Sequence, residues 1–130
     1  MQERELGIIK RTRLGYEDHG IFTFDVEFDF GSSGQSFGNY MIGTKNEEAR
    51  APVGSEYGIE VIMGILDAVG VNKWEDLVGR ECWIVRDESG FIISVEAPAY
   101  REHKGEFNIR KFTDEKRKNH LTKVRDHLEI

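Results

Sequence analysis

An uninterrupted alternation of apolar and polar residues over 21–30 constrains the fold of this chain more than any other feature. Every second position holds a large apolar side chain: Phe22, Phe24, Val26, Phe28 and Phe30. The positions between them are polar: Thr23, Asp25, Glu27 and Asp29. Because successive side chains of a strand point to opposite faces, this pattern predicts a β-strand with one face in the core and the other in solvent.

The rest of the chain predicts an α+β fold: an antiparallel sheet of two hairpins, one packed helix and a C-terminal helical arm. The predicted strands cover 6–14, 21–30, 40–42, 81–86 and 91–96, and 44–54 is expected to be a surface loop. A helix should run from an N-cap at Ser55 to Gly70, with an apolar stripe of Ile59, Ile62, Met63, Leu66 and Val69. A short turn is expected over 73–77. The pattern fits both an open sheet and a small curled barrel.

A terminal helix is expected to begin at Thr113, with a narrow apolar stripe of Leu121, Val124 and Leu128. We expect residues 1–100 to form a single α+β domain and residues 101–130 to form a basic C-terminal arm. Three apolar residues are enough to dock this helix on another surface, but too few to make it a core helix.

The net charge of −6 hides a strong asymmetry along the chain. Residues 1–100 carry 9 Lys and Arg against 18 Asp and Glu, whereas residues 101–130 carry 9 against 6. A basic arm on an acidic body is expected to lie on its own body, on a neighbouring subunit or on an anionic ligand. An acidic body is unsuited to duplex DNA, because phosphate contacts need a concentrated positive face.

The sequence also indicates a cellular compartment. No apolar run approaches the ~20 residues that cross a bilayer, and the first residues lack the apolar region of a signal peptide. Cys82 is the single cysteine, so no internal disulfide can form. We expect a cytoplasmic protein with no membrane partner.

The glycine-rich segment 31–40 is the first candidate site. Glycines let a backbone present its N–H groups to a ligand, and the amides and aromatic rings add polar and flat apolar contacts. The candidate residues are Gly34, Gln35, Phe37, Asn39 and Tyr40. No Gly-Lys-Ser/Thr follows, so the segment is not a nucleoside triphosphatase loop. A ligand-binding loop and an ordinary hairpin loop fit the residues equally well.

Two acidic clusters offer alternatives. Glu17, Asp18 and His19 could act as a general acid–base pair in a small hydrolase, although a polar turn explains them more simply. The carboxylates at 25, 27 and 29 could form a protein-binding face that inhibits a host nucleic-acid-handling enzyme, or a solvated outer face paired with Arg11 and Arg13. His120 and His127 are seven residues apart, too far for the usual zinc pair on a helix, so no metal site is expected.

Four segments carry a family resemblance; they are 14–21 (LGYEDHGI), 34–40 (GQSFGNY), 65–71 (ILDAVGV) and 74–80 (WEDLVGR). In these segments the chain resembles a family of small proteins encoded by bacteriophages and prophages. The resemblance covers residues 6–98 and leaves out the basic arm. Relatives tend to carry a further glycine where this chain has Ser33, Ser36 and Asn39. The resemblance implies no catalytic residue.

The chain is also similar in kind to phage proteins that counter host defence, among them the Thoeris anti-defence sponges. Those proteins sequester cyclic nucleotide signals between subunits of an oligomer. The resemblance therefore implies a non-enzymatic homo-oligomer without a cofactor, in the host cytoplasm, that binds a small nucleotide-type ligand.

The leading hypothesis joins the glycine-rich segment to the arm. The ligand would contact the five candidate residues of 34–40 together with His19, and the positive charge for its phosphates would come from the arm. The residues predicted for the phosphates are Arg101, Arg110 and Arg117.

Overall fold

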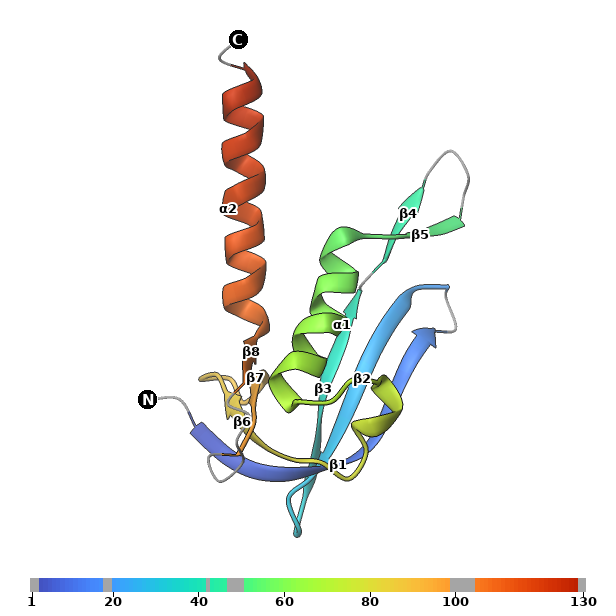
Figure 1. The fold of residues 1–130 in the computed structure, drawn as a ribbon, viewed down its shortest axis with the longest axis vertical. Helices are drawn as coiled ribbons and strands as arrows, with labels where there is room; N and C mark the ends of the chain where they lie inside the picture. Colours follow the sequence, from blue (N-terminus) through green and yellow to red (C-terminus); the bar gives the residue numbers. More distant parts are fainter. Residues whose placement is uncertain (1–2, 18–19, 42, 47–50, 99–104, 129–130) are drawn as a thin grey trace.

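In the part of the 130-residue chain that it describes, a computed structural model shows one six-stranded antiparallel sheet, a separate two-stranded ribbon and two long helices (Figure 1). The structure describes residues 3–17, 20–41, 43–46, 51–98 and 105–128. The sheet has the order β3-β2-β1-β6-β7-β8, so β3 and β8 are its edges and the sheet is open. The predicted α+β class is confirmed, and the structure decides between the open sheet and the barrel.

The sheet strands are β1 (Glu3–Tyr16), β2 (Phe22–Asp29), β3 (Gly34–Met41), β6 (Glu81–Arg86), β7 (Ile92–Glu96) and β8 (Glu106–Asn108). The long strand β1 joins the two predicted hairpins. Its second half pairs with β2 and its first half pairs with β6. A bulge lies between Ile9 and Arg11, and β1 bends visibly along its length (Figure 1). Bulges bend a strand, so the two halves of the sheet curl towards each other.

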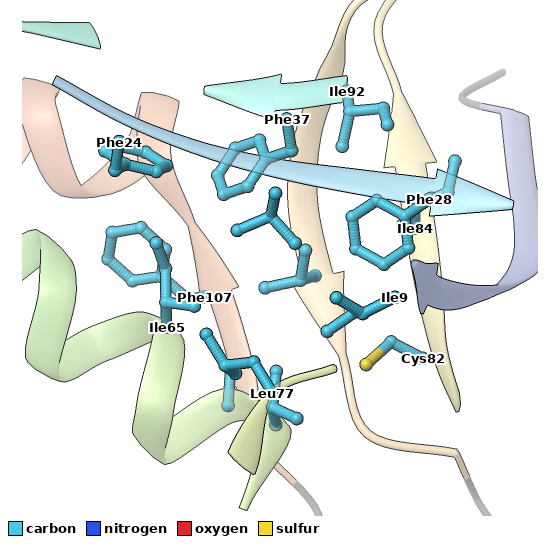
Figure 2. Packing of buried hydrophobic residues seen from close by; sticks show 14 of the residues in the cluster. Ile9, Phe24, Phe28, Phe37, Ile65, Leu77, Cys82, Ile84, Ile92 and Phe107 are labelled. Atoms are coloured by element: carbon cyan, nitrogen blue, oxygen red, sulfur yellow. The ribbon is translucent and has the colours of Figure 1, made fainter. Parts of the chain in front are cut away.

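The alternation in β2 builds the core as predicted. Phe24, Val26 and Phe28 are almost completely buried, and Phe22 and Phe30 are partly buried against the core. Figure 2 shows side chains from strands on both halves of the sheet meeting residues of the first helix and of β8. The side chain of Cys82 is fully buried in this cluster, where it acts as a small packed residue. Burial of this apolar area supplies most of the driving force for folding.

The first helix, α1 (Glu56–Val69), has the predicted ends. Ser55 accepts a hydrogen bond from the N–H of Gly58 at 2.9 Å, and Gly70 adopts the left-handed conformation with φ of 87°. A 3-10 turn, η1 (Trp74–Asp76), follows at the predicted place.

The predicted apolar stripe of α1 is only partly right: Val69 is buried and Ile62 and Leu66 pack against the core, but Ile59 and Met63 do not. Ile59 and Met63 are 60% and 56% exposed, and the buried face consists of Gly58, Val61, Ile65, Ala68 and Val69. Gly64 explains the rotation, because a Cβ atom there would lie 2.4 Å from the ring of Phe107. The helix turns its glycine side to β8, and two large apolar side chains are left in solvent.

The glycine-rich segment is mostly strand rather than loop. Gly34–Met41 pairs with β2, and a tight turn over 30–33 joins them. The stretch expected to be a surface loop also forms a ribbon, of β4 (Gly43–Asn46) and β5 (Ala51–Gly54). Backbone pairing makes both segments strands. The first pairs with the free edge of β2, and the two halves of 43–54 pair with each other.

The second helix, α2 (Ile109–Leu128), begins four residues before the predicted start. The Oδ1 of Asn108 accepts a hydrogen bond from the N–H of Lys111 at 3.0 Å and so caps the helix. Phe107 and Ile109 are buried, and these two anchors tie the start of α2 to the sheet. Thr113 lies within the helix, where its Oγ1 is 2.9 Å from the hydroxyl of Tyr57.

Candidate functional site

The turn of residues 30–33 presents the glycine-rich segment at one end of the sheet. The N–H of Phe30 donates to the carbonyl of Ser33 at 2.9 Å, and the N–H of Gly31 donates to the Oδ1 of Asp29 at 2.8 Å. Gly31 has φ of 97°, a conformation that favours glycine. Residues 31–34 are exposed, so this turn is accessible to a ligand.

Gln35, in the edge strand β3, links this edge of the sheet to β6 and to the turn that follows β6. Its Oε1 accepts a hydrogen bond from the Nε of Arg86 at 2.6 Å, and its Nε2 donates to the carbonyl of Gly90 at 2.7 Å. Arg86 ends β6, and Gly90 lies in the turn between β6 and β7. The side chain of Gln35 therefore bridges two segments that are about fifty residues later in the chain.

Arg86 is the centre of this contact. It is only 8% exposed, and its guanidinium lies 2.8 Å from the Oε1 of Glu5 and 3.5 Å from the Oε1 of Glu3. The guanidinium also lies over the ring of Phe30, 4.9 Å from the ring centre. A buried cation needs such partners, because an unpaired charge in the interior is costly.

Arg110, at the start of α2, reaches the same β6–β7 turn from the other side. Its guanidinium donates a hydrogen bond to the Oδ2 of Asp87. The Oδ1 of Asp87 accepts from the N–H groups of Ser89 and Phe91 at 2.9 and 3.0 Å, which fixes the turn. The hydrogen bond from Arg110 lowers the pKa of Asp87, and the two backbone N–H groups act in the same direction.

Two predicted site residues thus converge on one turn. Gln35 bonds Gly90 and Arg110 bonds Asp87, and the ring of Phe91 beside them is 67% exposed. We name residues 87–91 the convergence turn. Sequence patterns did not single out Arg86 or Phe91. Two signals were available in the sequence. Arg86 is a charged residue at an inward position of a strand, and Phe91 is a large aromatic residue directly after the turn glycine.

The other predicted residues lie as follows. Gly34 is exposed beside the turn of residues 30–33. Phe37 is buried, with its ring centre 5.6 Å from that of Phe24, so its contacts are with the core. Arg117 is exposed, seven residues after Arg110 and so about 10 Å further along α2 on a similar face.

Four predicted contacts stay predictions. The backbone of Asn39 and Tyr40 belongs to β3, but their side chains lie outside the described part of the structure. His19 and Arg101 lie wholly outside the described residues.

The proposed hydrolase cluster is described only at Glu17. Its Oε1 accepts a hydrogen bond from the hydroxyl of Thr23 at 3.2 Å. Asp18 and His19 are outside the described residues, so a role for this cluster in catalysis stays a prediction.

The acidic stripe of β2 is largely matched within the chain. Glu27 lies 3.5 Å from Arg11 and 4.0 Å from Lys10, and Asp29 holds the turn of residues 30–33. Asp25 differs from these two, because one of its oxygens is buried without a hydrogen-bond partner. Its burial raises the pKa of the carboxyl, although a hydrogen bond with Ser36 acts in the opposite direction. The pairing predicted between the stripe and Arg11 is thus present at Glu27, and a role of the stripe in protein binding stays a prediction.

Replacement of Asp25 by Asn is expected to stabilise the protein at neutral pH. A carboxyl whose pKa is raised on folding is more easily protonated in the folded state, so its ionisation costs stability as the pH rises from the unfolded value of 3.8. The gain of D25N should be present near pH 7 and vanish near pH 3, as measured by urea unfolding. E88Q, at an exposed turn position, is the control and should leave stability unchanged. A D25N variant less stable than the parent at neutral pH would contradict the assignment.

Within the described ranges, no helix is long and apolar enough to cross a membrane, and no group of three or more His, Cys, Asp or Glu side chains is placed to hold a metal ion. Comparison of the chain with models of known protein families, with curated proteins and with solved structures gives no match. A functional assignment therefore rests on the geometry of the convergence turn and its neighbours.

Proposed function

We propose that the chain binds a small nucleotide-derived immune signal and holds it without cleaving it, as a counter-defence protein in the cytoplasm of a phage-infected host. The observation that supports this proposal is the convergence of Gln35 and Arg110 on residues 87–91. Those two residues come from the glycine-rich segment and from the basic arm, the two parts of the chain that the leading hypothesis combines in one site.

The residues around the convergence turn match the parts of a nucleotide. The exposed ring of Phe91 can stack on a base, and base–aromatic stacking is tolerant of base identity. Arg110 can bind a phosphate, because a guanidinium has five N–H donors and can keep one bond to Asp87 while it forms others. The exposed turn of residues 31–34 offers glycine backbone close to Gln35.

Storage fits the site better than cleavage. Asp87 is the carboxylate nearest to Arg110, and the guanidinium holds its pKa below the ordinary value. A carboxylate with a lowered pKa is a weak base at neutral pH, so it suits a binding contact and not the removal of a proton. The proposed role of Asp87 is to orient Arg110.

Isothermal titration of the purified chain with a panel of cyclic nucleotides and cyclic ADP-ribose isomers tests the proposal. We expect saturable heat with at least one member, at micromolar or tighter affinity. The affinity should fall as salt is added, because a phosphate contact is screened by counterions. Absence of heat with every member of the panel would refute the proposal.

A further inference from the structure

The outer half of α2 extends away from the rest of the protein (Figure 1). The first half is anchored: Phe112 packs on Tyr57 and Phe107, and Lys116 bonds Glu56 and Glu60 of α1. Phe107, just before α2, lies against Gly64 of α1, whereas Lys116 lies against Glu56 at the start of α1. The two helices therefore run antiparallel, and α2 continues past the N-terminal end of α1 (Figure 1).

The described residues beyond this anchor are exposed. Arg117, Lys118 and Asn119 face solvent, and Leu121 is 59% exposed. Leu121 follows Phe112 by nine residues, which is two and a half helical turns, so it lies on the opposite side of α2 from the anchored face. An exposed leucine on this side of the helix is thus available to a partner surface.

The exposed face of α1 has the complementary chemistry. Ile59 and Met63 are one helical turn apart and more than half exposed, although α1 otherwise packs well. Glu56 and Asp67 flank them and are also exposed, and α1 contains no Lys or Arg. Ile59 and Met63 thus form an apolar strip in solvent, with an acidic border of Glu56 and Asp67, although Glu56 also bonds Lys116 of the same chain.

The two helices differ strongly in charge. The α2 sequence holds seven Lys and Arg against three Asp and Glu, whereas α1 holds three acidic residues alone. Pairing of α2 with a second α2 would bring like charges together. Pairing of α2 with α1 would join opposite charges, as Lys116 already does with Glu56 and Glu60 inside one chain.

We propose that the outer half of α2 docks on the exposed α1 face of a second copy of the chain, with Leu121 against Ile59 and Met63. Arg117 and Lys118 lie against the acidic border of that face. A two-fold axis makes the exchange reciprocal, so each arm covers one α1. The arrangement assigns Arg117 to the subunit contact, and Arg110 to the ligand. It rests on the homo-oligomer expected from the sequence and not on the ligand.

Sedimentation equilibrium without any nucleotide tests the exchange. At tens of micromolar and low salt we expect a mass near twice the 15.0 kDa of one chain, with dissociation promoted by added salt. R117E/K118E and, separately, D67K should each raise the dimer dissociation constant, the double reversal by about tenfold or more. K73E alters an exposed lysine outside both helices and should leave the dissociation constant unchanged.

Mixing the two charge-reversed variants identifies the surfaces. The mixture should form a heterodimer more readily than either variant forms a homodimer, because one of the two reciprocal contacts regains opposite charges. L121E provides an independent test at an exposed position, and it should also dissociate the dimer. A chain that stays at the mass of a monomer, or a dimer that is indifferent to all three changes, would overturn the inference. Because no ligand is present, a failure of nucleotide binding leaves this result unaffected.

Discussion

Replacement of Gly38 by Ala should lower the free energy of unfolding by about 4 kcal/mol, through backbone strain and overpacking combined. Gly38 lies in β3 opposite Asp25, next to the irregular pairing of β3 with β2, and has φ of 147°. A Cβ atom there would lie 2.4 Å from the carbonyl oxygen of Phe24 and 2.8 Å from the Cα of Asp25. Both atoms belong to the backbone of β2, which cannot move aside as a flexible side chain can.

Urea unfolding of G38A measures this loss, and G15A is the matched control. Gly15 lies in β1 with no neighbouring atom within 4 Å of its potential Cβ and without a positive φ. Its replacement should change stability by less than about 1 kcal/mol. Equal effects in the two variants would contradict the packing of β3 on β2. At Gly38 the glycine lets two strands of the protein approach each other closely.

The second large effect is expected on ligand binding. Replacement of Arg110 by Ala should lower the affinity for the tightest-binding nucleotide of the panel by about 10- to 100-fold. The reason is that a charge-assisted hydrogen bond contributes about 1.5–3 kcal/mol. The fold should survive, since Arg110 is exposed and the N–H groups of Ser89 and Phe91 still hold Asp87 in the turn. Calorimetry at constant salt gives the affinity, and thermal unfolding confirms that the variant is folded.

R11A is the control for this change. It removes one positive charge from an exposed arginine on the outer sheet face, which pairs with Glu27. Its affinity should equal that of the parent chain. If R110A and R11A weaken binding equally, the effect comes from net charge, and the convergence turn is not the binding site.

The sequence predicted the strands and helix ends that local patterns specify. The strand around Phe24 shows strict alternation, and the capping residue Ser55 and terminating Gly70 mark both ends of α1. Each of these signals depends on residues within one turn or one strand of each other. Such local signals can be read from the sequence without knowing which other segment packs against them.

The errors came from contacts between distant segments. The apolar residues of α1 surround most of the helix, so its sequence does not specify which face is buried. The packing of Phe107 against Gly64 determines that face. The helix α2 begins earlier in the chain than predicted, because Ile109 is buried against the sheet. Neither contact leaves a periodic signal in the sequence.

The candidate site was predictable in part. The sequence suggested that the glycine-rich segment and the basic arm combine, and Gln35 and Arg110 do meet at one turn. The role of Arg86 was not predictable, because its partners Glu5 and Gln35 come from two other strands. The burial of Phe37 follows from its place in β3, opposite Val26.

The central claim is that the chain holds an intact nucleotide signal. The most direct measurement is equilibrium dialysis of the chain against the panel, followed by denaturation and mass spectrometry of the released ligand. We expect that one member is retained by the protein and recovered at its original mass. Recovery of a hydrolysed product would point instead to an enzyme, and retention of no member would contradict the claim.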